Sequence, residues 1–244
     1  MKNIKKIHIP ILIALVFSIF SCTEDEIGTS LITNYPVFEL NGEDVIFINK
    51  GDEYSDPGVV VTENGVEIEY STSISSDFRN FSELDTNKPD IYRITYSAVN
   101  KDGFAGTASR TVIVTEQGNL IDNISGLYTS TVLRNGAGGA AYTDMEYVMI
   151  WKRDDGKYEM SDGIGLYYAV GRAYGNSYLA RPVIITANDI SSNDFSIPPF
   201  TVGTFGGVAE MTGLTADSVN KEVNYSTDWD AGYTFAVTLT QVEF

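Results

Sequence analysis

The sequence predicts an all-β protein with two domains, a β-sandwich followed by a second antiparallel β-domain. Two observations lead to this prediction. Short runs of β-branched and aromatic residues recur through residues 35–244, and turns rich in Gly, Asn and Asp separate them. Over the same stretch, no apolar pattern with the 3.6-residue period of an amphipathic helix extends over a useful length.

The first 21 residues have the order of a secretory signal. Three lysines lie among the first six residues, and an apolar run covers residues 9–20. That run is too short to span a bilayer comfortably, which favours a cleaved signal. It ends in Ile-Phe-Ser-Cys at residues 19–22, which resembles a bacterial lipobox. The resemblance implies cleavage before Cys22 and acylation of its thiol, with more than one acyl chain and therefore a stable anchor.

Removal of the signal leaves few side chains that could catalyse a reaction. The only histidine is His8, inside the signal, and the only cysteine is Cys22. The mature chain therefore lacks Ser-His-Asp and Cys-His catalysis, His- or Cys-bound zinc, and disulfides. No phosphate-binding or dinucleotide-binding glycine motif is visible. We expect a protein that is not an enzyme, with no catalytic residue and no cofactor.

The charge of the mature chain is strongly negative. Three of the 16 Lys and Arg residues lie in the signal and none of the 33 Asp and Glu residues do, which leaves 13 against 33 and a net charge of −20. A field of this sign disfavours nucleic acid and anionic membrane surfaces. It favours neutral or cationic ligands and a protein body held off the membrane.

Residues 22–34 are predicted to form the lipidated cysteine and a flexible acidic tether. About twelve polar, aperiodic residues of this kind span roughly 20 Å. The acidic residues 24–26, directly behind Cys22, resemble the surface-export signal of Bacteroidetes lipoproteins. That resemblance implies display on the outer face of the outer membrane. A solvated linker explains the same residues equally well, which leaves the periplasmic face as an alternative.

Residues 35–117 carry the strand pattern of a β-sandwich. The alternation of Tyr92, Ile94 and Tyr96 with polar residues indicates one buried and one solvated face. Several short strands at this spacing, in about 80 residues, are typical of a sandwich. The expected strands are residues 45–48, 58–62, 91–96 and 111–115.

Four motifs follow one another in this first domain: Gly-Asp-Glu-Tyr-Ser-Asp-Pro-Gly-Val at residues 51–59, Tyr-x-Ile-x-Tyr at 92–96, Asp-Gly at 102–103 and Arg-Thr-Val-x-Val at 110–114. Together they resemble the signature of the bacterial surface immunoglobulin-like domain, the type also found repeated in pesticidal crystal proteins. The resemblance covers residues 35–116. It implies an immunoglobulin-like sandwich that serves as a spacer or adhesive module, with no catalytic residues.

Residues 118–244 are predicted to form the second domain, and residues 119–244 hold 14 of the 22 Gly, 10 of the 15 Tyr and both Trp. Hairpin turns are expected at residues 154–156 and 228–232. Eight antiparallel strands predict a small barrel or a second sandwich, and the first and last strands resemble those of a lipocalin-type barrel. The expected strands are residues 126–132, 147–151, 158–161, 165–170, 183–186, 208–211, 223–226 and 233–239.

Aromatic residues of the second domain are the best candidates for ligand binding. Sugar rings present an apolar face that stacks on Tyr and Trp, while Asp, Asn and Arg bind the hydroxyls. Trp229 lies in a predicted turn where an indole has no obvious core to fill, and a second aromatic and polar group surrounds Gly171 and Gly175. The candidate glycan-binding residues are Trp229, Tyr167, Tyr174, Tyr178, Arg172, Asn176, Asp228 and Asp230.

Other residues of the second domain have simpler interpretations. Tyr168 shares a face with Leu166 and Val170, and Trp151 aligns with Met149, so both aromatic rings are expected in the core. The alternating apolar residues of 233–239 form one inward face. Acidic turns offer oxygen ligands to calcium, but their spacing matches no known calcium loop, and no metal is expected. Among the 15 acidic residues of this domain, no pair stands out as the two carboxylates of a glycoside hydrolase.

The order of signal, acidic tether, immunoglobulin-like domain and Gly/Tyr-rich β-domain resembles the lipoproteins of Bacteroidetes polysaccharide-utilisation systems. The resemblance implies a non-catalytic accessory at the outer membrane that binds glycan, with the bilayer and outer-membrane importer components as further partners and no nucleic acid. The alternative is a structural or protein-interaction lipoprotein, whose second domain binds a partner protein or a small apolar ligand. Tyr and Trp are enriched at protein interfaces too, so composition does not separate the two.

Overall fold

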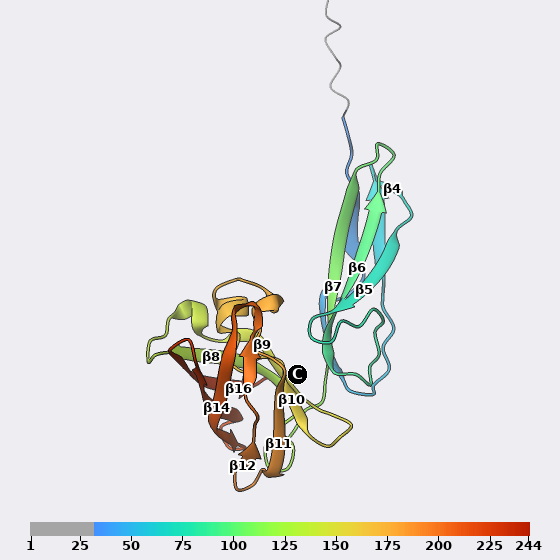
Figure 1. Cartoon of the computed structure of the whole chain (residues 1–244). Helices are drawn as coiled ribbons and strands as arrows, with labels where there is room; N and C mark the ends of the chain where they lie inside the picture. The colour runs from blue at the N-terminus through green and yellow to red at the C-terminus, as the bar shows by residue number, and fades with distance from the viewer. Residues whose placement is uncertain (1–31) are drawn as a thin grey trace, which may run out of the picture. The chain divides into compact units, whose positions relative to one another are not determined.

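The computed structural model describes residues 32–244 (Figure 1). The signal, Cys22 and the acidic residues behind it lie outside the described residues. Residues Tyr35–Phe244 form one compact unit. Within residues 32–244 the structure is built from strands, with four short helical segments, and no helix there is long and apolar enough to cross a membrane. The predicted all-β class is confirmed.

The first domain is a sandwich of two sheets. One sheet has the order β1 (Val37–Leu40), β3 (Val59–Glu63) and β4 (Val66–Glu67). The other has the order β2 (Val45–Asn49), β7 (Ala105–Thr115), β6 (Asp90–Val99) and β5 (Ser71–Ser76), and β2 runs parallel to β7. Apolar side chains from both sheets share one core. The immunoglobulin-like sandwich is therefore confirmed, and Tyr92, Ile94 and Tyr96 are buried in its core as predicted.

A buried charge network joins the elements of this sandwich. Arg110, on β7, is completely buried, and its guanidinium forms an ion pair with Asp56. The same guanidinium donates to the Tyr96 hydroxyl at 2.7 Å and to the carbonyls of Asn41 at 2.6 Å and Glu43 at 2.9 Å. The Tyr96 hydroxyl donates to the Asp56 carboxylate at 2.7 Å. Three of the motifs that identified the domain in the sequence thus meet at one point.

The second domain is a single antiparallel sheet that curls into a half-barrel (Figure 1). It takes a form between the two that were expected, since one sheet curves without closing and no second sheet packs against it in residues 118–244. The sheet order is β12 (Asp194–Ser196), β11 (Val183–Asp189), β10 (Tyr158–Met160), β9 (Met145–Lys152), β8 (Gly126–Arg134), β16 (Tyr233–Gln241), β15 (Glu222–Trp229), β14 (Gly206–Asp217) and β13 (Phe200–Val202). Along β15 and along β16 from Phe235 onward, buried residues that face inward alternate with more accessible residues that face outward.

The segment between β10 and β11 fills the inside of the curl. The prediction of a strand at residues 165–170 is wrong, because this segment contains a π-helical turn, η2 (Tyr167–Gly171), followed by a short helical turn, η3 (Asn176–Tyr178). Gly165 and Leu166 have φ angles of +64° and +67°, which end any extended conformation. A Cβ at Gly165 would lie 2.6 Å from Ser130 Oγ and 2.7 Å from a Val237 methyl, so glycine lets the segment approach β8 and β16 closely.

One buried carboxylate fixes this segment at both ends. Asp162 Oδ1 accepts hydrogen bonds from the N–H groups of Ile164 and Ala180, both at 3.0 Å. Its Oδ2 accepts the N–H of Leu166 at 2.8 Å. Burial raises the pKa of Asp162 to about 6, against the opposing effect of the three N–H donors. Because Ala180 and Ile164 lie at opposite ends of the segment, Asp162 closes it into a loop.

The compact unit includes contacts between the two domains. The ring of Phe78 stacks on Trp151 of β9, with centroids 6.2 Å apart and an interplanar angle of 16°. The guanidinium of Arg79 lies 5.0 Å from the centroid of the same indole, and Arg181 donates to the carbonyl of Phe78. Trp151 is buried, which confirms its expected place in the core. Part of that core comes from the first domain.

Replacing Arg110 by Ala is expected to lower the free energy of unfolding by about 2–4 kcal/mol, because it leaves Asp56 and Tyr96 without their buried partner. Lys101→Ala is the matched control: Lys101 is exposed and its ion pair with Glu63 spans 3.9 Å, so the loss should stay under about 1 kcal/mol. Urea unfolding followed by circular dichroism measures both changes. Equal losses for the two variants would contradict the role assigned to Arg110.

Replacing Asp162 by Ala is expected to cost at least about 3 kcal/mol at pH 7, because three buried N–H groups lose their acceptor. Asp217→Ala is the control, since Asp217 also accepts backbone N–H groups, from Val219 and Asn220, but in an exposed turn. The same urea titration measures both. A loss at Asp162 no greater than the loss at Asp217 would show that the carboxylate does not hold the segment.

The stabilising effect of Asp162 is expected to weaken as the pH rises. Its pKa is raised by burial from 3.8 to about 6, so the folded protein binds this proton more tightly than the unfolded chain does. This adds a pH-dependent contribution of about 3 kcal/mol to the hydrogen-bond contribution that remains at pH 7; it is complete below pH 4 and is lost as the pH rises through 6. The difference in unfolding free energy between the wild type and Asp162→Ala should therefore shrink from pH 4 to pH 7. A difference that grows over this range would contradict the assignment.

Candidate functional site

Nine aromatic rings form a continuous cluster at one end of the second domain. Each ring lies within 6.2 Å of at least one other, measured between centroids. We call this group the aromatic cluster. Its members are Tyr142, Tyr167, Tyr168, Tyr174, Tyr178, Phe205, Trp229, Tyr233 and Phe235.

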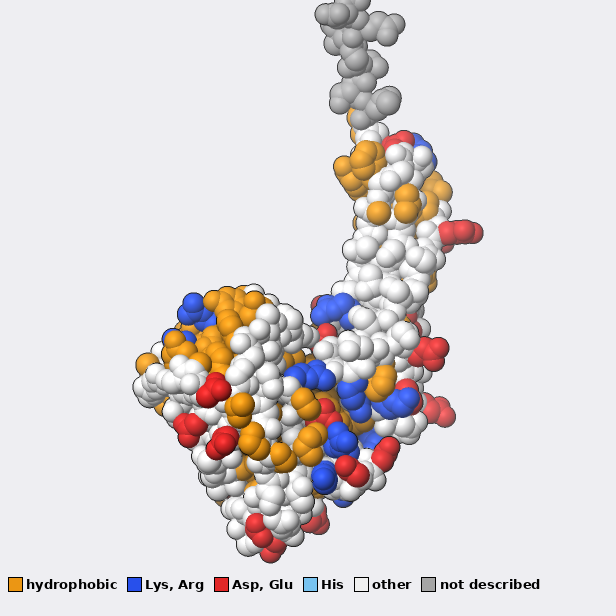
Figure 2. All heavy atoms as spheres, viewed as in Figure 1, with side chains coloured by type: hydrophobic (Ala, Val, Ile, Leu, Met, Phe, Trp, Pro, Cys, Tyr) orange, Lys and Arg blue, Asp and Glu red, His pale blue; other side chains and the backbone are white. Residues whose placement is uncertain are grey.

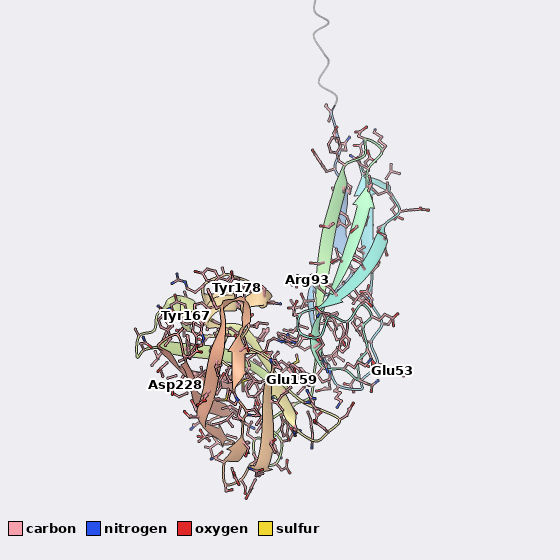
Figure 3. All side chains as sticks on the ribbon, viewed as in Figure 1. Glu53, Arg93, Glu159, Tyr167, Tyr178 and Asp228 are labelled. Atoms are coloured by element: carbon pink, nitrogen blue, oxygen red, sulfur yellow. The ribbon has the colours of Figure 1, made fainter. Side chains whose placement is uncertain are left out.

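Loops and strand ends together hold the cluster in place. The rings come from η1 (Ala140–Tyr142), η2, η3, η4 (Gly203–Phe205) and the adjoining ends of β15 and β16. Figure 3 labels Tyr167 and Tyr178 at the end of the domain where Figure 1 draws the segment after β10. Gly203 has a φ of +40°, and a Cβ there would lie 2.6 Å from the Tyr178 backbone. Glycine at this position lets η4 lie directly on η3.

The cluster has a buried layer and an exposed layer. Tyr167, Tyr168, Trp229 and Phe235 are buried, and they pack against the inner face of the sheet. Tyr174 and Phe205 are exposed by 44% and 46%. These two rings lie 6.2 Å apart and both contact Tyr178, at 5.1 Å and 4.8 Å. The outer layer is therefore a small aromatic surface with a rigid aromatic support beneath it.

Apolar and cationic side chains surround this surface. Figure 2 shows hydrophobic side chains gathered over this end of the domain with basic side chains next to them. The guanidinium of Arg134 lies 4.9 Å from the Tyr167 ring centroid and that of Arg172 lies 5.9 Å from the Tyr174 centroid. In a chain of net charge −17, this end thus combines aromatic faces with two guanidinium groups.

Hydroxyl groups add hydrogen-bonding capacity at the rim. Arg172 Nη1 donates to the Tyr142 hydroxyl at 3.4 Å. Hydrogen bonds with Tyr167 and with Arg172 lower the pKa of Tyr142, whereas burial raises the pKa of Tyr167. The rim therefore presents guanidinium donors and phenol groups that donate and accept, next to the exposed rings.

The three candidates around residue 229 do not share a surface. Trp229 belongs to β15 and is only 9% exposed, because the loop at η4 covers it; its Nε1 donates to the Gly206 carbonyl at 3.2 Å. The expectation of an indole without a core to fill is wrong. Asp228 is exposed and accepts a hydrogen bond from Thr234 Oγ1 at 2.7 Å. Asp230 accepts the N–H of Val208 at 2.9 Å, so it supports the pairing of the start of β14 with the end of β15.

The second candidate group is only partly brought together. Tyr174, Tyr178 and Arg172 lie on or beside the exposed layer, and Tyr167 lies beneath it. The Asn176 side chain is already engaged in a hydrogen bond with Asp77 of the first domain. Tyr168 is buried as predicted, but Val170, expected on the same inward face, is exposed because the segment turns helically there.

Phe205 and Tyr142 belong to the cluster, although neither is among the candidates identified from the sequence. Phe205 contacts four other rings, and Tyr142 stacks on Tyr167 at 4.3 Å with an interplanar angle of 11°. Phe205 directly precedes the paired glycines Gly206–Gly207, and Tyr142 follows the pair Gly138–Gly139 after two alanines. An aromatic residue close to two glycines in a predicted loop is the signal that could have identified them.

The described residues contain no group of three or more His, Cys, Asp or Glu side chains that could hold a metal ion. The oxygen-rich turn at residues 188–194 is connected internally instead. Asn188 donates its amide to Asp194 at 3.1 Å, and Asp189 accepts the N–H of Ser191 at 3.0 Å.

Comparisons with known proteins agree with this architecture. The family model of the bacterial surface protein immunoglobulin-like domain matches residues 38–114, and a family model described as a C-terminal domain matches residues 117–241. A search of curated proteins gives no match. Among solved structures, the crystal structure of the lipoprotein BT2262 from Bacteroides thetaiotaomicron is similar, with a TM-score of 0.63 and 25% identity. The match covers 85% of this chain and 100% of that one.

The two family models follow each other along the chain and meet between residues 114 and 117. The second alone spans half of the chain, and the similarity to BT2262 extends across both domains. The chain therefore belongs to the family of membrane-associated bacterial surface lipoproteins that are similar to BT2262, in which an immunoglobulin-like domain precedes a C-terminal β-domain.

Proposed function

We propose that this lipoprotein binds glycan through the exposed layer of its aromatic cluster, as a non-catalytic accessory of polysaccharide capture and uptake. In this proposal the acyl groups on Cys22 hold the protein at the outer membrane, facing the cell exterior, close to the components of an importer. The single observation that supports glycan binding best is the pair of exposed rings, Tyr174 and Phe205, supported by Tyr178.

The geometry of the exposed layer suits a sugar ring. A pyranose has an apolar face of C–H groups, and it gains most from an aromatic ring that is already fixed in place, because little side-chain entropy is then lost on binding. Phe205 is fixed by contacts with Tyr168 at 4.8 Å and Trp229 at 5.8 Å. Arg172 next to Tyr174 offers several N–H donors to sugar hydroxyls or to a carboxylate of an acidic sugar.

Binding without catalysis is consistent with what surrounds the rings. Glycoside hydrolysis requires two carboxylates on either side of the scissile bond, roughly 5–10 Å apart. The acidic groups nearest in sequence to the cluster, Asp228 and Asp230, are engaged by Thr234 and by the Val208 N–H. The buried carboxylate, Asp162, accepts three backbone N–H groups beneath the rings. These three carboxylates thus have structural partners.

The alternative function, docking of a partner protein, draws on the same surface. Val170, on η2, and Val208, on β14, are exposed aliphatic residues of the same domain. Aromatic residues with Arg are enriched where proteins bind each other. A partner protein would bury these aliphatic side chains together with the rings, whereas a sugar would contact the ring faces alone. Substitutions of the aliphatic residues therefore separate the two functions.

Affinity electrophoresis in gels containing a panel of polysaccharides tests the proposal. The wild type should be retarded by at least one glycan, and Tyr174→Ala and Phe205→Ala should each weaken the retardation about tenfold, the effect of losing roughly 1.4 kcal/mol of stacking. Trp229→Ala is a poor test because Trp229 is buried, and its loss would disturb the cluster itself.

Phe104→Ala is the matched control, because Phe104 has the same 46% exposure as Phe205 but lies in the first domain. Retardation of Phe104→Ala should equal that of the wild type. If no glycan retards the wild type, glycan binding by this surface is rejected. If Val170→Ser and Val208→Ser abolish co-purification with importer components and the gels show nothing, the docking function replaces it.

A further inference from the structure

A second exposed apolar patch lies at the end of the first domain where the described chain begins. Figure 2 shows hydrophobic side chains gathered there, at the opposite end of this domain from β10 and the second domain. The patch consists of five exposed side chains, Tyr35, Val37, Val66, Val99 and Phe104. The rings of Tyr35 and Phe104 are in contact, with centroids 5.5 Å apart. We call it the N-terminal patch.

The sheet topology places all five residues at one end of the sandwich. Val37 begins β1, whose partner β3 runs antiparallel and ends here, and Val66 begins β4 after the tight turn that follows β3. Val99 ends β6, and Phe104 directly precedes β7. The Lys101 N–H donates to Glu63 Oε2 at 3.1 Å, which ties the turns of the two sheets together.

These five side chains belong to neither hydrophobic core, so packing inside the protein does not explain why they lie together on the surface. Isolated exposed apolar residues are ordinary, but an adjacent group with two aromatic rings indicates a surface that is covered in use. Tyr, Phe and aliphatic residues are the side chains that partition into the interface between water and the acyl chains of a bilayer.

The number of residues between Cys22 and Tyr35 limits how far the N-terminal patch can lie from the membrane anchor. Twelve residues separate Cys22 from Tyr35, so the N-terminal patch lies within about 45 Å of the acylated cysteine even if the chain between them is fully extended. A tether of this length gives the patch an effective concentration at the bilayer in the millimolar range. A patch that binds a membrane only weakly by itself is therefore helped by the anchor.

We infer that the N-terminal patch inserts its apolar side chains into the interfacial region of the lipid bilayer that carries the acyl anchor. The inference rests on acylation of Cys22, and it is independent of glycan binding by the aromatic cluster. It assigns to the first domain a membrane contact in addition to its connecting role. It departs from the expectation of a body held off the membrane, which rested on the net charge of the chain and not on this local apolar surface.

The charges near the patch determine which bilayers it fits. Lys101 is paired with Glu63, and Asp102 and Glu67 are exposed close by, so the patch carries no net positive charge. The whole chain is strongly acidic. Insertion should therefore be stronger in zwitterionic phosphatidylcholine than in vesicles rich in anionic phosphatidylglycerol, and the difference should fade at high salt.

The experiment uses the acylated protein in phosphatidylcholine vesicles and an environment-sensitive fluorophore on a new cysteine. Because Cys22 is the only cysteine and is blocked by acylation, one new cysteine is labelled uniquely. Asp102→Cys places the probe beside Phe104, and Asp154→Cys places it in the exposed β9–β10 turn of the second domain. We expect blue-shifted emission and several-fold stronger quenching by headgroup spin-labelled lipid at position 102 than at 154.

Adding Tyr35→Ser and Phe104→Ser should remove most of the quenching at position 102, while Phe205→Ser, equally exposed but in the aromatic cluster, should leave it unchanged. Equal quenching at positions 102 and 154, or no effect of the Tyr35 and Phe104 substitutions, would overturn the inference. A probe at 102 that responds only to a membrane protein added to the vesicles would assign the patch to that protein instead. A chain without acyl groups would overturn the inference and the anchor together, and would leave the glycan gels unaffected.

Discussion

The candidate site depends on the three hydrogen bonds that Asp162 accepts. A half-barrel leaves its concave side open, and an irregular segment has to fill it with side chains while its own backbone N–H groups are buried. Such groups cost about 1–3 kcal/mol each when they lack an acceptor. Asp162 satisfies three of them at once and joins Ile164 to Ala180. Tyr167 and Tyr168 lie between these two ends, so the base of the aromatic cluster is positioned by a group that never touches a ligand.

The fold could be predicted where each strand contains its own pattern. On β16, Phe235, Val237 and Leu239 alternate with exposed residues, and the alternation is enough to identify the strand and its buried face. The motifs of the first domain predict more than strands, because Asp56, Tyr96 and Arg110 form its buried charge network. The strands β4, β12 and β13 have two or three residues each, too few to show a period.

The candidate site was harder to predict, because segments far away in the sequence determine which of its side chains are exposed. Trp229 is buried by the loop that carries Phe205, which nothing in the sequence near residue 229 reveals. Residues 165–169 are all buried, so this run has no alternation that could distinguish a strand from a helical turn. Tyr174 and Tyr178 could be found because glycine and polar residues surround them, a composition that favours an exposed loop.

The long strand β7 has a consequence for where ligands are captured. It begins next to Phe104, at the N-terminal patch, and ends at Thr115, where the chain passes into the second domain. Its eleven residues rise by roughly 35 Å at about 3.3 Å per residue. If the patch rests on the bilayer and β7 stands along the membrane normal, this rise places Thr115 roughly 35 Å from the patch. The immunoglobulin-like domain then acts as a spacer, and the length of β7 determines how far the start of the second domain lies from the membrane.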